Sequence, residues 1–220
     1  MKNDMKQINH HLTDALLMGY SAGTLPEAFN LVVSSHISLC DECRARMHEF
    51  DAVGGAIMLD QGSVPVGEGA FAATMALIND AKWDTPTSTP AKKDAAFPQP
   101  LLDYIGGDMS KVKWRKLGGG VCQAILPTTK DATARLLKIP AGAAVPDHGH
   151  RGTELTLVLQ GAFEDESDRF NAGDIEVANE DMVHQPIAKE GVDCICLTAT
   201  DAPLQFSGLI PRVAQRVFRI

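Results

Sequence analysis

Two stretches of the sequence carry histidine and cysteine residues at spacings that suit metal binding. The first reads H-x3-C-x2-C and places His36, Cys40 and Cys43 within eight residues. If this stretch is helical, successive residues turn by about 100°, so the three side chains share one face. A fourth ligand would complete a tetrahedron, and either His10 or His11 could supply it. Because zinc accepts both thiolate and imidazole, we expect a closed structural zinc site here.

The second stretch reads G-x5-H-x-H-x3-E-x6-G between Gly142 and Gly161. Two histidines that alternate by two point to the same side of a strand. A later histidine, in the segment Asp181–Pro186, could join them. Three imidazoles and one carboxylate form a site for a divalent metal such as Zn, Fe, Mn or Ni. The residues concerned are His148, His150, Glu154 and His184.

Each pattern has a plainer alternative. Cys40 and Cys43 could be small buried residues beside a surface histidine. The second pattern could belong to a β domain that keeps the sequence motif but binds no metal.

The elements that would position the first group are helical. Apolar residues recur at intervals of three and four from Leu12 to Tyr20, and Gly23 suits the end of that helix. A second helix should follow, with Pro26 in its first turn. A third should start near Asp41 and end before the Gly54–Gly55 pair, and a fourth should cover about 70–81.

The second half of the chain has the character of a β domain. Short runs rich in Val, Ile, Leu and Thr alternate with Gly, Pro and Asp, which is typical of a sandwich or barrel. The expected strands include 134–139, 154–159, 174–178 and 194–200. The segment 83–100 is rich in Pro, Thr, Lys and Asp and resembles a linker. We therefore predict an α + β protein with helices in 1–85, a linker at 86–100 and a β-barrel in 101–220.

Charge and composition narrow the possible functions. Residues 1–85 hold five Lys/Arg against eleven Asp/Glu, out of a net charge of -8 for the chain. This acidic half would repel phosphate backbones and attract a basic protein, so we expect no direct nucleic-acid binding. No apolar run reaches the ~20 residues of a membrane helix, and no export signal is recognisable, which favours the cytoplasm. Five cysteines without export favour metal or redox roles over disulfides.

The second pattern resembles the first conserved motif of the cupin superfamily at every position. The later stretch from Gly173 to His184 resembles the second cupin motif only in part. Asn171 stands where a proline is usual, and the histidine lies further past the glycine than in the commonest version.

Both halves together resemble the ChrR family of zinc-binding anti-sigma factors. The similarity is strongest in His10–Leu17, Gly23–Phe29, and His36–Arg46 with Asp51–Gly55. It implies a zinc-binding helical domain joined to a cupin β-barrel. The zinc ligands that it implies are His11, His36, Cys40 and Cys43; the cupin ligands are His148, His150, Glu154 and His184, with zinc as the expected ion.

The resemblance also implies a function. Such a protein binds and inhibits an extracytoplasmic-function sigma factor, one to one, and releases it under oxidative stress of the singlet-oxygen type. The apolar faces of the first and fourth helices are then expected contacts, although Leu16, Leu17 and Tyr20 could equally be core residues. We identify no catalytic residue. The main alternative is a cupin metalloenzyme, a dioxygenase or isomerase, with the helices as an accessory module. A third possibility is a regulator that binds a small molecule or a metal and whose cupin has no redox role.

Two further cysteines, Cys194 and Cys196, alternate along a predicted strand and should share one face of it. They could form a second redox element, although such residues are more often packed in a strand core.

Overall fold

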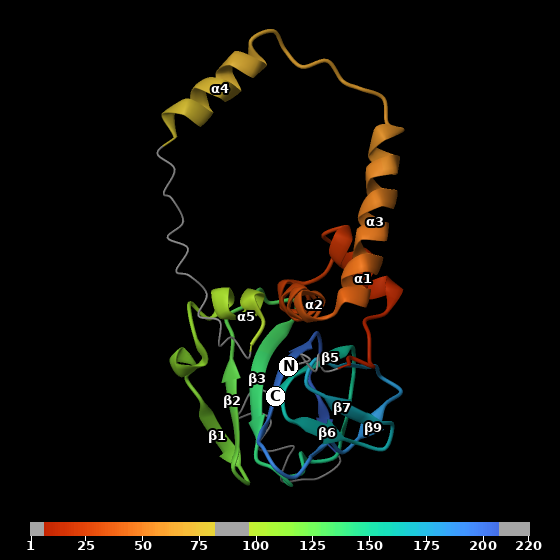
Figure 1. The fold of residues 1–220 in the computed structure, drawn as a ribbon, viewed down its shortest axis with the longest axis vertical. Coiled ribbons are helices and arrows are strands. Elements are labelled where there is room, and N and C mark those ends of the chain that lie inside the picture. The colour runs from red at the N-terminus through yellow and green to blue at the C-terminus, as the bar shows by residue number, and fades with distance from the viewer. Residues whose placement is uncertain (1–6, 82–96, 207–220) are drawn as a thin grey trace, which may run out of the picture.

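The computed structural model describes residues 7–81 and 97–206. Its first part is helical, as predicted, and its second part consists mainly of strands (Figure 1). The helices are α1 (Asp14–Ser21), α2 (Glu27–Leu39), α3 (Asp41–Leu59), α4 (Ala70–Asp80) and α5 (Gln99–Tyr104), followed by the 3-10 turn η1 (Met109–Lys111). Most of the expected linker lies outside the described residues, but its last two residues already belong to α5.

Local chemistry accounts for most helix boundaries. The Thr13 side chain accepts a hydrogen bond from the backbone N–H of Leu16 and so caps α1. Pro26 stands just before α2 rather than in its first turn. The expectation that the third helix ends before Gly54 is wrong, because α3 continues to Leu59. Glycine costs a helix only about 1 kcal/mol and leaves the backbone hydrogen bonds in place, so the residues that follow can continue it.

The strands form three antiparallel sheets. A six-stranded sheet has the order β1-β2-β3-β11-β5-β8, and two three-stranded sheets have the orders β10-β6-β7 and β12-β4-β9. The strands are β1 (Arg115–Gly118), β2 (Val121–Ile125), β3 (Thr133–Ile139), β4 (His148–Gly149), β5 (Glu154–Gln160), β6 (Ala162–Glu164), β7 (Arg169–Asn171), β8 (Ile175–Ala178), β9 (Val183–His184), β10 (Ile187–Ala188), β11 (Cys194–Thr200) and β12 (Gln205–Phe206).

The predicted closed barrel is therefore corrected to a set of separate sheets. The strands of the two smaller sheets are only two or three residues long, too short to continue the hydrogen-bonded ladders from either edge of the large sheet. The four strands expected from the sequence are all present, as β3, β5, β8 and β11.

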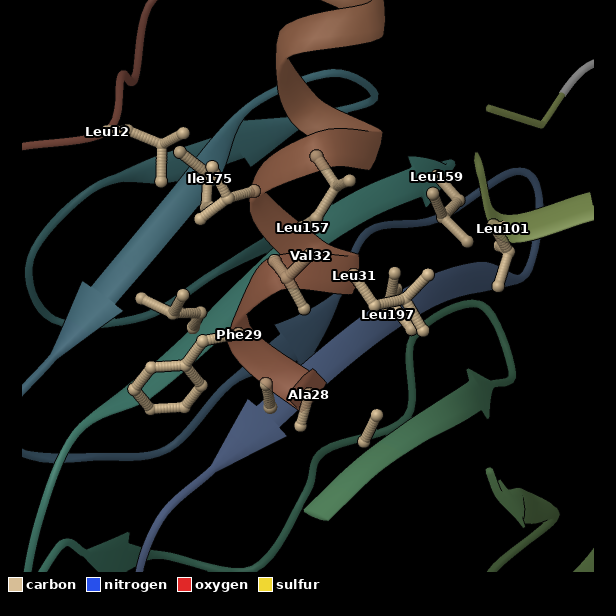
Figure 2. Close-up of a cluster of buried hydrophobic side chains, with 14 of the residues drawn as sticks. Leu12, Ala28, Phe29, Leu31, Val32, Leu101, Leu157, Leu159, Ile175 and Leu197 are labelled. Atoms are coloured by element: carbon tan, nitrogen blue, oxygen red, sulfur yellow. The ribbon is translucent and has the colours of Figure 1, made fainter. Parts of the chain in front are cut away.

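One core joins the helices to the large sheet. Helix α2 lies across one face of that sheet, where Val32 points toward Leu157 and Leu197 (Figure 2). All three side chains are fully buried, and burial of each contributes about 1.5–3 kcal/mol. On β5 and β11 alternate residues face α2, so the residues between them face the opposite side of the sheet. That opposite side holds the second candidate metal group.

No helix among the described residues is long and apolar enough to cross a membrane.

Candidate metal centres

The structure brings together the four expected ligands of the helical half. The donor atoms of His11, His36, Cys40 and Cys43 all lie within 4.8 Å of one another. The Nδ1 atom of His11 is 3.3 Å from the Cys40 sulfur and 3.6 Å from the Cys43 sulfur, and Nε2 of His36 is 3.3 Å from the Cys43 sulfur. Three of the four side chains are buried. His10 points away, toward Asp168, whereas His11 lies beside the two cysteines.

The junction between α2 and α3 creates this arrangement. His36 lies in the last turn of α2, Cys40 is the residue between the helices, and Cys43 lies in the first turn of α3. The Cys40 sulfur accepts a hydrogen bond from the backbone N–H of Cys43, which caps α3. The motif is thus split across two helices rather than carried on one continuous helix.

The donor set fits a tetrahedral zinc ion. With zinc–sulfur bonds of about 2.3 Å and zinc–nitrogen bonds of about 2.0 Å, the edge between a sulfur and a nitrogen ligand is about 3.6 Å. Burial lowers the pKa of His36 to about 4, so its imidazole is neutral and can bind a metal. The other ring nitrogen of His11 lies 3.4 Å from the Glu42 carboxylate, a contact that commonly orients a metal-binding histidine. Burial also raises the pKa of the Cys43 thiol to about 12, so zinc must displace that proton.

The second group lies on the sheet face opposite α2. Nε2 of His184 is 3.2 Å from Nε2 of His148 and 3.3 Å from Nε2 of His150. The edge between two nitrogen ligands of a tetrahedral zinc is about 3.3 Å. All three residues are buried. His148 and His184 are register partners on the adjacent strands β4 and β9, which fixes their separation.

Hydrogen bonds at the outer ring nitrogens orient these imidazoles. Nδ1 of His148 donates to the carbonyl oxygen of Pro146 at 2.9 Å. Nδ1 of His184 faces Asp165 at 2.7 Å and Glu176 at 3.2 Å. In both rings the Nε2 atom therefore remains directed toward the cluster, as metal ligands require. Burial lowers the pKa of His148, which also favours the neutral ligand form.

Two carboxylates that the sequence analysis did not identify, Asp165 and Glu176, contact His184 and raise its pKa. Burial raises the pKa of Glu176 to about 7. Burial would also raise the pKa of Asp165, but hydrogen bonds from Glu176, Ser167 and His184 outweigh it and hold that pKa well below its usual range. Against the effect of its own burial, hydrogen bonds to Glu176 and Asp165 raise the pKa of His184 to about 9. The sequence did offer a signal for Glu176: it is a charged residue within the otherwise apolar strand Ile175–Ala178.

Glu154, the fourth expected ligand, reaches the same cavity but not the tight group of three nitrogens. Its carboxylate lies 3.9 Å from Nδ1 of His150 and accepts a hydrogen bond from Thr156 at 3.1 Å. Nδ1 of His150 is buried without a hydrogen-bond partner. Ligation by Glu154 therefore stays a prediction.

The remaining candidates are placed as follows. Leu17 is fully buried, and Leu16 and Tyr20 pack against the same core, which favours their interpretation as core residues.

Cys194 and Cys196 share one face of β11 as predicted, with their sulfur atoms 3.6 Å apart. Their burial, and for Cys196 a pKa raised by the hydrogen bond with Cys194, favour packed thiols over reactive ones.

Comparison with known proteins identifies the family. The model of the ChrR cupin-like domain matches residues 103–203. The anti-sigma-E factor ChrR of Cereibacter sphaeroides is 58% identical over 214 residues, which cover 97% of this chain and 99% of that protein. The chain belongs to the ChrR family of anti-sigma factors. This membership also confirms the expectation that it is a regulator rather than an enzyme.

A solved structure of high sequence identity agrees with this family membership. ChrR from the crystal structure of Rhodobacter sphaeroides SigE in complex with the anti-sigma ChrR is 57% identical, with a TM-score of 0.78 over 89% of this chain and 100% of that one. An RmlC-like cupin from Ralstonia eutropha is 23% identical, covers 47% of this chain and 71% of its own, and has a TM-score of 0.41. That last likeness is too remote to carry an argument.

Proposed function

We propose that this chain binds and inhibits an extracytoplasmic-function sigma factor, one to one, in the cytoplasm where RNA polymerase works. Under oxidative stress of the singlet-oxygen type it releases the sigma factor. In support, a relative that is 58% identical is an anti-sigma-E factor, and a ChrR chain that is 57% identical was solved in complex with SigE.

The observation that carries the proposal is a pair of apolar helix surfaces over which none of the described residues packs. On α3, the exposed side chains of Ile57, Met58 and Leu59 follow the part of the helix that packs on the core. On α4, Phe71 and Leu77 are 80% and 74% exposed, and no residue of this helix is buried. Both stretches lie away from the sheets (Figure 1). Large exposed apolar surfaces of this kind mark protein interaction sites, and an amphipathic helix binds its partner through its apolar face.

The negative charge of the helical half supports a partner with a basic surface. The first 85 residues hold eleven Asp/Glu against five Lys/Arg, and opposite charge speeds association and disfavours the wrong partners.

We further propose that His11, His36, Cys40 and Cys43 bind one structural zinc ion. It would tie the segment before α1 to the junction of α2 and α3, and so hold these elements in the form that binds a partner. The β domain would bind a second divalent metal, with zinc as the expected ion, through His148, His150, Glu154 and His184.

Release would follow when a metal site is lost. Oxidation of the Cys40 or Cys43 thiolate removes a zinc ligand, and the segment that carries His11 is then held by fewer contacts. A change in the β-domain site could reach the helices through the core that α2 shares with β5 and β11.

The test uses the full-length chain. It should be co-expressed with each extracytoplasmic-function sigma factor of its own genome in turn, and the complex isolated through a tag on the sigma factor. We expect a one-to-one complex and silencing of a promoter that depends on this sigma factor. The double variant Phe71→Glu/Leu77→Glu should weaken the complex at least about 100-fold, because it places charges in the proposed apolar contact.

Val192→Glu is the matched control, since Val192 is also an exposed apolar residue, 58% exposed, but lies in the β domain far along the chain from α4. It should bind as the unaltered chain does. If the α4 double variant binds and silences equally well, this surface is not the contact. If no sigma factor from the same genome binds the full-length chain, the function itself is wrong.

A further inference from the structure

The large sheet and the two small ones enclose a cavity of about 350 Å³, which is lined by His148 and His184 and extends well beyond them. That volume lies within the range of small-molecule sites. Most of its wall is apolar, with Leu117, Val121, Leu137, Ile139 and Phe163 among the lining residues. Apolar cavities of about 150 Å³ are already large enough to bind a benzene-sized molecule. The cavity thus has room for an apolar group beside the metal ligands.

A buried cation faces this cavity. Arg135 lines it and is only 5% exposed, in the middle of β3. Its neighbours Ala134 and Leu136 are fully buried on the opposite, helix-covered side of the sheet. Arg135 pairs with Thr198 of β11 on one side and with Ile125 of β2 on the other. The backbone of Arg135 is therefore held on both sides and cannot carry the charge out to solvent.

The guanidinium group of Arg135 lacks the partners that burial normally demands. Its Nε and Nη1 atoms are buried and have no hydrogen-bond partner within residues 7–81 and 97–206. A guanidinium group only donates hydrogen bonds and stays charged in proteins, so leaving it unpaired in an apolar cavity is costly. Burial lowers the pKa of Arg135, opposed by the charge of Glu154. Glu154 offsets the charge at a distance but makes no hydrogen bond to Nε or Nη1.

We propose that the cavity binds a small monocarboxylate with an apolar body, whose carboxylate accepts hydrogen bonds from Arg135. The apolar body lies against Leu137, Ile139 and Phe163. A single negative charge is expected, because the cavity offers one arginine and already contains the carboxylates of Glu154 and Glu176. A dianion such as a phosphate monoester would leave one charge uncompensated among apolar walls. The ligand site does not depend on sigma-factor binding.

Octanoate is a suitable probe, and 1-octanol is its uncharged counterpart of the same chain length. Binding of each to the full-length, metal-loaded chain should be measured by isothermal titration calorimetry. We expect octanoate to bind at least about tenfold more tightly than octanol, since a hydrogen bond to a charged group is involved. Arg135→Met should weaken octanoate binding about 10- to 100-fold and leave octanol binding unchanged. Arg135→Lys should retain part of the preference, because it keeps the charge.

Arg169→Met is the control, because Arg169 is an exposed arginine on β7 that does not line this cavity. It should bind octanoate normally. Thermal unfolding gives a second readout: octanoate should raise the melting temperature of the unaltered chain and of Arg169→Met, but not of Arg135→Met.

Three results would overturn the proposal. Octanoate and octanol could bind the unaltered chain equally, octanoate could bind Arg135→Met as tightly as the unaltered chain, or octanoate could fail to bind the unaltered chain at millimolar concentration. The second result would place the carboxylate on the metal instead of on Arg135. If Arg135→Met does not fold, the comparison of acid with alcohol on the unaltered chain and on Arg135→Lys still decides the question.

Discussion

Asp174, the residue just before β8, accepts hydrogen bonds from the backbone N–H groups of Asn9 and His10, at 2.7 and 3.1 Å. Its second carboxylate oxygen accepts from the N–H of Asn171 at 2.8 Å. Asp174 is fully buried. His10 precedes the proposed zinc ligand His11, and Asp174 lies two residues before Glu176, which contacts His184. This short path links the surroundings of the two candidate metal centres.

Asp174→Ala should lower the free energy of unfolding by about 3 kcal/mol, because three backbone N–H groups lose a charged acceptor. It should also speed the loss of zinc from the helical site, since the segment before His11 loses its anchor. Urea unfolding and zinc transfer to a chromophoric chelator measure the two effects. Asp168→Asn is the control, because Asp168 contacts the His10 ring from an exposed position, and this change should leave the urea unfolding midpoint where it is in the unaltered chain. Equal rates of zinc loss in Asp174→Ala and the unaltered chain would argue against the anchor.

Cys43→Ser should remove about one zinc ion per chain while leaving any metal of the β domain in place. The hydroxyl of serine is a much poorer zinc ligand than a thiolate. Elemental analysis after dialysis measures the metal content. Cys122→Ser serves as the control, because Cys122 is a partly exposed thiol outside both clusters. An unchanged zinc content in Cys43→Ser would remove this residue from the ligand set.

Zinc affinity of the helical site should rise with pH between 6 and 8. The pKa of Cys43 is raised to about 12 by burial, so this thiol keeps its proton over that range and releases it only when zinc binds. The pKa of His36 is lowered to about 4, so this imidazole is already neutral and releases none. Each proton released makes the association constant rise about tenfold per pH unit. Competition with a chelator of known pH dependence measures the slope, and a slope of zero would contradict a protonated Cys43 in the metal-free chain.

Asp165→Asn should weaken metal binding in the β domain about 10- to 100-fold, the usual effect of losing a partner that orients a ligand. The Asp165 side chain is fully buried against Nδ1 of His184, and its negative charge strengthens that imidazole as a ligand. Asp181→Asn, a change at an exposed carboxylate three residues before the same histidine, is the control. Metal titration of the metal-free chain measures both affinities. If the two variants bind alike, Asp165 plays no part in orienting His184.

Short-range sequence patterns predicted several features, because over a few residues of regular backbone the spacing fixes the relative directions of the side chains. H-x3-C-x2-C placed three ligands within two turns of chain, and all of them meet even though the helix breaks at Cys40. Alternation predicted that Cys194 and Cys196 share a face, and the apolar runs predicted four strands within one residue at each end. In each case the positions are tied together by a few residues of regular backbone, and little else is needed.

Contacts between distant segments were decided only by the tertiary structure. The packing of α2 on β5 and β11, the anchoring of His10 by Asp174, and the placement of Asp165 and Glu176 at His184 join residues that no local period relates. Sequence spacing left His10 and His11 equivalent, and only the family resemblance had favoured His11 before the structure placed it beside the two cysteines. The separation into three sheets likewise depends on how short strands meet in space. Arg135 had no pattern to distinguish it, because an arginine in a strand becomes unusual only once its surroundings are buried and apolar.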